Sequence, residues 1–297
     1  MIDAWLRERR TLVEQTLDRH LPPADTPPAV IHEAMRYAVL GGGKRVRPIL
    51  AIAAAEAVGA DATPLLQAFA ALELIHTYSL VHDDLPALDD DELRRGRKTT
   101  HVVYGEAMGI LAGDALLTEA FSWLSKPIEG VPAERQLRAV ALVARAVDST
   151  GMIGGQVADL EATGAGQETR APREALEFIH RNKTGKLITA SVLLGGTLGG
   201  ATEKQLGALE RYGVALGLAF QIVDDLLDQE ESSATLGKTA GKDAAQGKLT
   251  YPAVMGVEAA RAELASLLEG ALGNAGMIAG PVNYLGDIAR FICDRRS

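Results

Sequence analysis

The sequence predicts an all-α fold, organised as a single domain of about ten helices over residues 1–297. Alanine and leucine dominate the apolar residues, and both lose little conformational freedom in a helix. Apolar side chains recur at helical spacing along most of the chain, and no strand–turn–strand pattern is recognisable. With 47% hydrophobic and 23% charged residues, the composition is that of an ordinary globular protein with a substantial core.

Gly and Pro residues separate the helical segments. Pro64 after Thr63, and Pro172 before Glu174, are typical of a first helical turn. The glycine-bearing segment 162–171 is expected to be a loop. The predicted helices cover residues 2–20, 28–40, 46–58, 63–84, 104–124, 132–149, 151–162, 172–194, 203–231, 250–270 and 278–294.

Charge and targeting signals narrow the class of protein. The net charge of −9 argues against nucleic acid as the main partner, because duplex binding needs a basic face. Cys293 is the one cysteine, so no internal disulfide is expected. The amphipathic N-terminus lacks the apolar core of a secretory signal, and no apolar run reaches the roughly 18 residues of a membrane span. We therefore expect a cytoplasmic protein.

Two aspartate clusters carry the strongest chemical signal. In the second cluster, within AFQIVDDLLDQE, Gln221, Asp224, Asp225 and Asp228 recur at helical spacing and are expected to share one face. The apolar residues between them would form the opposite face. Like charges on one face repel one another, so a cleft-facing cluster requires a compensating cation.

The first cluster, HDDLPALDDDE, requires a bend. Asp83 and Asp89 are six positions apart, about 240° around an ideal helix, and Pro86 would disturb a continuing helix. We expect Asp83 and Asp84 in the last turns of a helix, with the chain curling back to bring Asp89 beside them.

The residue types of these clusters favour a hard cation. Carboxylate oxygens without Cys and with few His residues select Mg²⁺, which fills its remaining positions with water and substrate phosphates. For either cluster alone, a solvated helix end is the better interpretation. The presence of two, each after an apolar helical run, favours a metal–phosphate site.

Basic residues gather in four short segments. GGGKRVRP places Lys44, Arg45 and Arg47 after flexible glycines, although it lacks the spacing of a P-loop. Arg94 and Arg95 follow the first aspartate cluster. The other segments are HRNKTGKL, with Lys183 and Thr184, and LGKTAGKDAAQGKLTYP, with Lys238, Lys242 and Lys248. A solvated face is the usual fate of such residues, and we retain that interpretation for Lys242 and Lys98.

Taken in order, these motifs resemble those of the trans-isoprenyl diphosphate synthases, and within them the bacterial farnesyl diphosphate synthases. The matching segments are GGGKRVRP, the DDxxxxD motif followed by LRRG, GDALL at 113–117, GGQ at 154–156, KTG at 183–185, and FQIVDDLLD followed by GKTAGKD and YP. No single segment is specific, but the ordered set covers nearly the whole chain.

The resemblance implies an isoprenoid synthase fold around a deep central cavity, a homodimer, and condensation of an allylic diphosphate with isopentenyl diphosphate. It implies that three Mg²⁺ ions, with Mn²⁺ as a substitute, are bound by Asp83, Asp84, Asp89, Asp224, Asp225 and Asp228. The allylic diphosphate would be held by Arg94, Lys183, Lys238 and Lys248. Isopentenyl diphosphate would be held by Lys44, Arg47, His76 and Arg95, and Thr184 and Gln221 would face the allylic cation.

Product length is expected to depend on Tyr78 and Ser79, which precede Asp83 by five and four residues, about one helical turn. A ring there would floor the substrate pocket. The resemblance favours farnesyl diphosphate, made from dimethylallyl and geranyl diphosphate; packing alone is the alternative role of Tyr78.

The residues leave three alternative functions open. The first is a geranyl or geranylgeranyl diphosphate synthase. The second is a class I terpene cyclase, for which Lys44, Arg47 and Arg95 would be idle because a cyclase binds no second diphosphate. The third is a non-catalytic helical protein that binds divalent cations. The C-terminal Arg295 and Arg296 are expected either to close over the isopentenyl site or to be ordinary surface charge.

Overall fold

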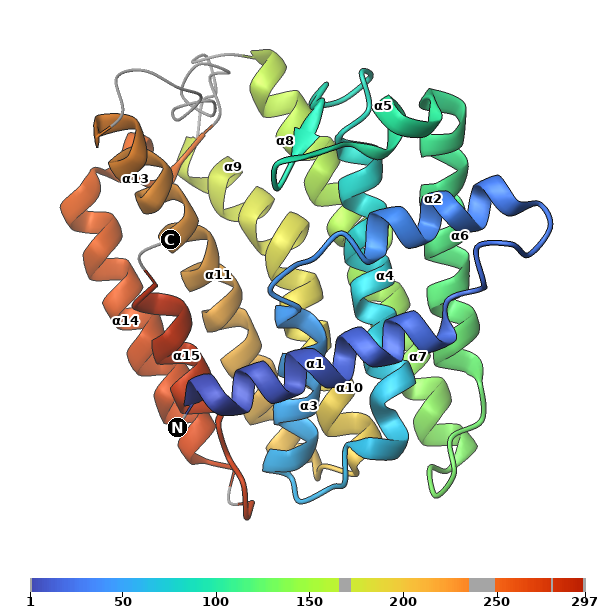
Figure 1. Ribbon diagram of the computed structural model, residues 1–297. Coiled ribbons are helices and arrows are strands. Elements are labelled where there is room, and N and C mark those ends of the chain that lie inside the picture. Colours follow the sequence, from blue (N-terminus) through green and yellow to red (C-terminus); the bar gives the residue numbers. More distant parts are fainter. Residues whose placement is uncertain (1, 166–171, 235–248, 279, 296–297) are drawn as a thin grey trace. The chain divides into compact units, whose positions relative to one another are not determined.

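The computed structural model describes residues 2–165, 172–234, 249–278 and 280–295, which are mostly helical (Figure 1). Their contacts divide the chain into two units. Unit 1 comprises Met1–Ile52 and Asp61–Val140, and unit 2 comprises Ala53–Ala60 and Ala141–Ser297. The all-α prediction is confirmed, and each unit is described by itself below.

Unit 1 contains the first group of helices and one short hairpin. Its elements are α1 (Ile2–His20), α2 (Ala29–Val39), the first part of α3 (Val46–Ala57), η1 (Thr63–Leu65), α4 (Leu66–Asp83), β1 (Leu93–Arg94), β2 (Arg97–Lys98), α5 (Thr100–Tyr104), α6 (Glu106–Ser125) and the first part of α7 (Ala133–Val147).

Helix α4 is the core helix of unit 1. It lies beside α6 and also contacts α1 and α2 (Figure 1). Its residues are apolar on nearly every side, and Phe69, Leu72 and Leu74 are fully buried, as expected of a helix surrounded by others. Because other helices contact α4 on several sides, the position of the residues at its C-terminal end is fixed.

The expectation that the chain contains no strand–turn–strand pattern is wrong. β1 and β2 pair as an antiparallel hairpin in which Leu93 faces Lys98 and Arg94 faces Arg97. The turn is made by Arg95 (φ 53°) and Gly96 (φ 74°). With two residues in each strand, the hairpin is too short to show an alternating pattern.

Unit 2 contains the remaining elements. They are α8 (Met152–Ala165), α9 (Pro172–Ile179), the π-helical turn η3 (His180–Gly185), α10 (Lys186–Gly199), α11 (Glu203–Ala234), α13 (Tyr251–Met255), α14 (Val257–Gly276) and α15 (Leu285–Cys293).

Helix α11 is the core helix of unit 2 and packs against α10, α14 and η3. Between Glu203 and Gln229 it is long and apolar enough to cross a membrane; among the described helices it alone meets these criteria. Most of this segment is buried against other helices, as in the core of a globular protein, so it is weak support for a membrane span. Tyr212 on α11 donates a hydrogen bond to Leu285 O (2.8 Å), which joins α15 to this helix.

Several boundaries differ from those expected. The helix predicted over 104–124 is broken at Gly105 (φ 89°), which separates α5 from α6. Gly256 (φ 85°) separates α13 from α14 in the same way. The expected loop 162–171 is helical up to Ala165, and its remaining residues lie outside the described ranges. Both breaks occur at a glycine with positive φ, a conformation that glycine adopts readily. A single glycine in a sequence does not reveal its φ, so these breaks were not predicted.

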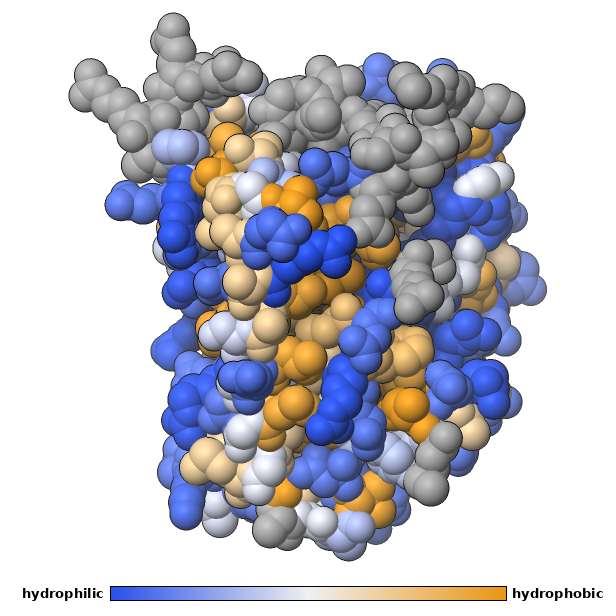
Figure 2. All heavy atoms as spheres, turned by 90° about the vertical axis from the view of Figure 1, so that its left-hand side faces the viewer, coloured by the Kyte–Doolittle hydropathy of each residue, from blue (hydrophilic) through white to orange (hydrophobic). Residues whose placement is uncertain are grey.

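The side of the molecule on which α14 lies in Figure 1 mixes hydrophilic and hydrophobic side chains (Figure 2). In unit 2 the exposed large apolar side chains include Met277 and Phe291. Scattered exposure of this kind is normal for a protein surface and by itself marks no binding site.

Candidate active site

The first aspartate cluster forms the bend that its spacing predicts. α4 ends at Asp83, and Asp84 follows as its C-cap. The backbone then turns back, because Asp89 N donates to Asp83 O (2.8 Å) and Asp91 N donates to Asp84 O (3.1 Å). Asp83 and Asp89 are therefore close in space and both partly exposed.

Asp84 has a different environment from Asp83. It is 4% exposed, and its Oδ1 accepts hydrogen bonds from Arg94 Nε (2.8 Å) and Nη2 (2.6 Å). Desolvation raises the pKa of Asp84, and Arg94 partly offsets this effect. The hydrogen bond and charge of Asp84 raise the pKa of Arg94 against the opposing effect of its own desolvation. This pair ties the hairpin to the end of α4, while the proposed metal and diphosphate roles of the two residues stay predictions.

The glycine segment before α3 lies against the hairpin. Arg95 Nη1 donates a hydrogen bond to Gly42 O. Gly43 has φ 152°, where a side chain would be strained, and a Cβ at this position would lie 2.7 Å from Arg95 Nη1, so the Arg95 side chain would have to shift. Lys44 is exposed and Arg47 is half-buried, at the start of α3 as the sequence suggests.

A pocket in unit 1 collects basic side chains. Its walls include Arg94, Arg95, Arg97 and Lys98, together with the acidic Glu73 and Asp84. Arg97 stacks on the ring of Tyr37, with 4.4 Å between the guanidinium carbon and the ring centroid, and Tyr37 donates to Lys98 O (2.7 Å). Guanidinium groups are well suited to phosphate oxygens, so the charge of this pocket suits an anionic ligand.

His76 lies within the same field of positive charge. Desolvation lowers its pKa well below 6.5, and the guanidinium groups of Arg47, Arg95, Arg94 and Arg45 lower it further. The imidazole is therefore neutral near pH 7, where it can donate one N–H to a ligand but contributes no charge.

Tyr78 is buried and Ser79 is half-buried. Tyr78 is 6% exposed, and its ring makes an edge-on contact with His82 at 5.9 Å between centroids. Desolvation, followed by the charge of Asp83, raises its pKa to about 12. The Tyr78 hydroxyl has no hydrogen-bond partner among the described residues, and Ser79 Oγ donates to His76 O (2.9 Å). Their control of product length stays a prediction.

The second aspartate cluster lies on α11, where its residues recur at the helical spacing that the sequence shows. Ile222, Val223 and Leu226 are buried as expected, but Asp225 is also only 9% exposed, whereas Asp224 is partly exposed. Asp225 Oδ2 accepts a hydrogen bond from Tyr251 N (2.8 Å) at the start of α13. A carboxylate near a helix N-terminus is favourable, and this contact satisfies one of its first N–H groups.

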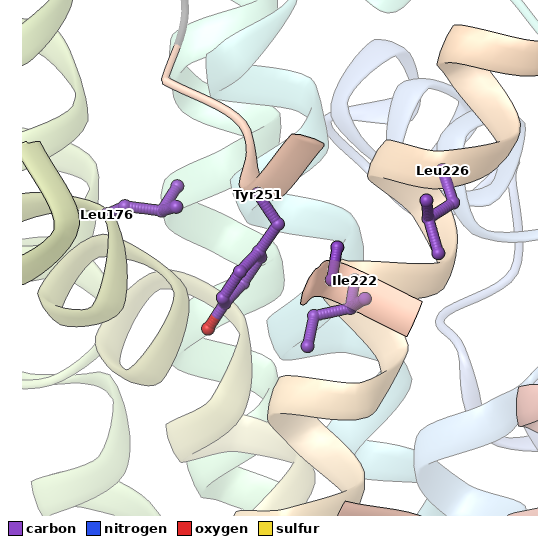
Figure 3. Close-up of a cluster of buried hydrophobic side chains, with 5 residues drawn as sticks. Leu176, Ile222, Leu226 and Tyr251 are labelled. Atoms are coloured by element: carbon purple, nitrogen blue, oxygen red, sulfur yellow. The ribbon is translucent and has the colours of Figure 1, made fainter. Parts of the chain in front are cut away.

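A hydrophobic cluster supports this contact. The Tyr251 ring lies between Leu176 on α9 and Ile222 on α11, with Leu226 and Ala260 beside them (Figure 3). The cluster therefore fixes the position of the backbone N–H that Asp225 binds. Gln221, Asp224 and Asp228 are partly exposed on α11.

Asp224 is bound by the C-terminal segment. Arg295 Nη2 lies 2.6 Å from Asp224 Oδ1, and its guanidinium carbon lies 4.2 Å from the centroid of the Phe220 ring. The Arg295 side chain is only 10% exposed. It is therefore not surface charge, and its contact in unit 2 is with the second aspartate cluster. Arg296 lies outside the described residues.

Lys183 and Thr184 lie on the π-helical turn η3, where both are half-buried. Lys183 Nζ forms an ion pair with Asp159 Oδ2 (2.6 Å) on α8. A Cβ at Gly155 of the GGQ motif would overlap the backbone of Lys183, so α8 and η3 pack through their main chains. π-Helical turns are frequent at functional sites. Lys238 and Lys248 lie outside the described residues.

Two functional candidates, Asp159 and Glu73, were not recognised from the sequence, and Arg45 was named only as one of the basic residues of the glycine segment. Asp159 follows Gln156 by three residues and so lies on the same helical face, a spacing that the sequence does show. Arg45 and Glu73 pair with each other across 28 positions, and no local pattern indicates such a contact.

The donor atoms fit Mg²⁺. Among the described residues, no three His, Cys, Asp or Glu side chains are arranged to hold a metal ion by themselves. The partly exposed Asp83 and Asp89 in unit 1, and Asp224 and Asp228 in unit 2, supply carboxylate oxygens. Mg²⁺ commonly takes one or two such ligands and completes its shell with water and phosphate oxygens, so this donor set suits an ion that arrives with a diphosphate.

Comparisons with known proteins agree on one family. The profile of the family described as Polyprenyl synthetase matches residues 28–282. A chloroplastic geranylfarnesyl diphosphate synthase of Leucosceptrum canum is 47% identical over 266 residues, which cover 90% of this chain and 72% of that protein. A geranylgeranyl diphosphate synthase of Cyanophora paradoxa is 46% identical, covering 86% and 83%. The crystal structure of an FPP/GFPP synthase from Zymomonas mobilis is similar with a TM-score of 0.84 at 32% identity, covering 98% of each chain.

Proposed function

The chain belongs to the polyprenyl synthetase family and is a prenyltransferase, and we propose that it condenses isopentenyl diphosphate with allylic diphosphates in a Mg²⁺-dependent reaction. The observation that carries this proposal is the pairing of two types of site. Oxygen donors for metal ions lie on α4 and α11, and a pocket lined by basic side chains lies beside the glycine segment.

The chemistry follows from the residue types. Cleavage of the allylic C–O bond produces a diphosphate anion, so catalysis consists mainly of stabilising the leaving group's charge. Mg²⁺, when bound, supplies Lewis-acid stabilisation of that charge. Lys183 and Arg94 would hold the same diphosphate. Lys44, Arg47, His76 and Arg95 would hold isopentenyl diphosphate, whose C–O bond is not cleaved.

The carbon–carbon bond forms when the double bond of isopentenyl diphosphate attacks the allylic cation. Thr184 and Gln221 would face this cation, and an apolar pocket would keep water from it. The departed diphosphate would accept the proton lost in the last step, so the reaction needs no protein base.

Relatives favour a C20 product. Similar curated proteins include several geranylgeranyl diphosphate synthases and a geranylfarnesyl diphosphate synthase. Geranylgeranyl diphosphate is therefore better supported than the farnesyl diphosphate expected from the sequence. One observation keeps farnesyl diphosphate as the second candidate: the ring of Tyr78 is buried one turn below Asp83, where it would limit chain growth.

A homodimer is part of the proposal. Ile110 and Leu111 on α6 are 48% and 53% exposed, and Leu111 also lines a largely apolar groove with Ile31 and Met35 of α2. An exposed apolar groove of this kind suits a second copy of the chain. Light scattering should give twice the mass of 31.4 kDa, and a monomer at micromolar concentration would contradict the dimer. The cytoplasmic location also stays a prediction, since several relatives are chloroplastic.

The function is tested by incubating the purified protein with isopentenyl diphosphate, dimethylallyl diphosphate and Mg²⁺. We expect inorganic diphosphate to be released and C15 or C20 products to appear, and both to stop with a chelator. A terpene cyclase would consume an allylic diphosphate without isopentenyl diphosphate. Absence of diphosphate release with C5, C10 and C15 allylic substrates would favour the non-catalytic cation-binding alternative.

A further inference from the structure

Arg45 differs from the other cations of the glycine segment because its side chain points into unit 1. The residue is 3% exposed and has φ 52°, a conformation that is uncommon for a residue with a side chain. Its Nη1 donates to Glu73 Oε1 (2.7 Å), and its Nη2 donates to Val39 O (2.8 Å). The guanidinium therefore ties the segment to α4 and to the last residue of α2 at the same time.

The partner, Glu73, is a buried carboxylate in the middle of the basic pocket. It is 3% exposed, lines the pocket with Arg95, and lies one helical turn before His76 on α4. Its charge also acts on Arg95, in opposition to the repulsion from Arg45 and Arg94. Glu73 thus holds together guanidinium groups that would otherwise repel one another before an anionic ligand arrives.

A buried ion pair is an inefficient way to stabilise a fold. Removing two charges from water is costly, and well-packed apolar residues are often as stabilising. The left-handed backbone at Arg45 adds a further cost. A pair with these costs is expected to have a role beyond stability, such as fixing the positions of neighbouring side chains.

Those neighbours are the residues that would bind isopentenyl diphosphate. Lys44 precedes Arg45 directly, and Arg47 follows it by two residues at the start of α3. Gly42 O, in the same segment, accepts a hydrogen bond from Arg95. We propose that the Arg45–Glu73 pair positions Lys44, Arg47 and Arg95 for isopentenyl diphosphate without touching the substrate. This inference rests on the proposed function, which assigns Lys44, Arg47 and Arg95 to that substrate.

The test replaces Glu73 by glutamine, which keeps the volume and an acceptor oxygen but removes the charge. We expect the KM for isopentenyl diphosphate to rise by about tenfold or more, because the buried Arg45 guanidinium loses the charge of the carboxylate to which it donates a hydrogen bond. Glu14 remains, but its Oε1 lies 3.9 Å from Arg45 Nε. The KM for the allylic diphosphate should stay within about twofold, because its proposed site depends on other residues. Equal increases in both KM values, or no change in either, would overturn the inference.

A double variant separates positioning from stability. Arg45→Met with Glu73→Leu removes both charges, and its melting temperature should equal or exceed that of Glu73→Gln. Calorimetric titration with isopentenyl diphosphate alone, in the presence of a chelator, should nevertheless show weakened binding. If the double variant melts like the wild type and also binds like the wild type, the pair has no positioning role.

Asp18→Asn provides the control, because Asp18 forms an ion pair with Arg36 in the same unit but does not line the basic pocket. This variant should keep both KM values within about twofold of the wild type. If the proposed function itself is wrong, the wild type will release no diphosphate, and this result differs from a failure of the positioning role. A wild type that turns over, with unchanged binding in the Arg45 and Glu73 variants, would refute the positioning role alone.

Discussion

His180 should make the protein less stable as the pH falls below 6.5. The residue begins η3, is 6% exposed, and lies against the Tyr251 ring at 5.2 Å between centroids. Desolvation lowers its pKa to about 4; the charge of Asp159 opposes this shift and that of Lys183 adds to it. In the unfolded chain the pKa returns to about 6.5, so the unfolded state binds a proton first as the pH falls.

The sign and size follow from this difference. Above pH 6.5 the imidazole is neutral in both states and pH has no effect on stability through this group. Between pH 6.5 and about 4 only the unfolded state is protonated, so the free energy of unfolding falls with pH. One pKa unit corresponds to about 1.4 kcal/mol, which gives a loss of about 2 kcal/mol at pH 5 and on the order of 3 kcal/mol at pH 4.

Urea unfolding of the wild type and of His180→Phe at pH 7 and pH 5 measures this contribution. The phenyl ring retains the contact with Tyr251 but cannot be protonated, so the wild type should lose about 2 kcal/mol more than the variant. A parallel NMR titration of the His180 ring should give a pKa near 4. Equal losses in the two proteins, or a ring that titrates near 6.5, would refute the reasoning.

Three further predictions concern the aspartate clusters and the pocket below them. Asp225→Ala should lower the free energy of unfolding by about 1–3 kcal/mol because it leaves Tyr251 N unpaired. Asp224→Asn, which keeps an oxygen for Arg295, should reduce turnover without this loss. Urea unfolding and diphosphate release together test both variants, and equal stabilities would contradict the assignment. Arg295→Gln should strengthen Mn²⁺ binding to the substrate-free protein several-fold, because it removes the cation bound to Asp224. Electron paramagnetic resonance measures this affinity, and an unchanged value would show that Arg295 and the metal ion do not compete for Asp224. Tyr78→Ala should lengthen the product by at least one C5 unit, and an unchanged product in chromatography would remove Tyr78 from control of chain length.

The fold was largely predictable because helix formation depends on short-range patterns. α1 and α11 begin within one residue of their expected positions, since each shows a long apolar repeat. The π-helical turn within the helix expected over 172–194 was not foreseen, because it depends on how α8 packs against it. The β1–β2 hairpin was missed for a different reason: its four paired residues carry no recognisable period.

The chemistry of the candidate site was more predictable than its geometry. The bend between Asp83 and Asp89 followed from Pro86 and the six-residue spacing alone. The inward orientation of Asp225 could not be predicted in the same way. It is set by Tyr251, a partner 26 residues away, whose position depends on tertiary packing.

The same applies to the C-terminal arginine. Arg295 lies 71 positions from its partner Asp224, and only the packing of α15 on α11 brings them together. Pattern analysis can therefore name the residue types of a site, but the partner of each side chain depends on contacts between distant segments.

The close packing around η3 limits how this protein can be redesigned. A Cβ at Gly217 of α11 would lie 2.7 Å from Gly185 Cα, and one at Gly155 of α8 would overlap Lys183. Main chains that touch in this way have no side chain between them that could adjust its rotamer. A mutant library aimed at new prenyl products should therefore keep these glycines constant and place its diversity at positions such as 78 and 79, where the contacts are made by side chains.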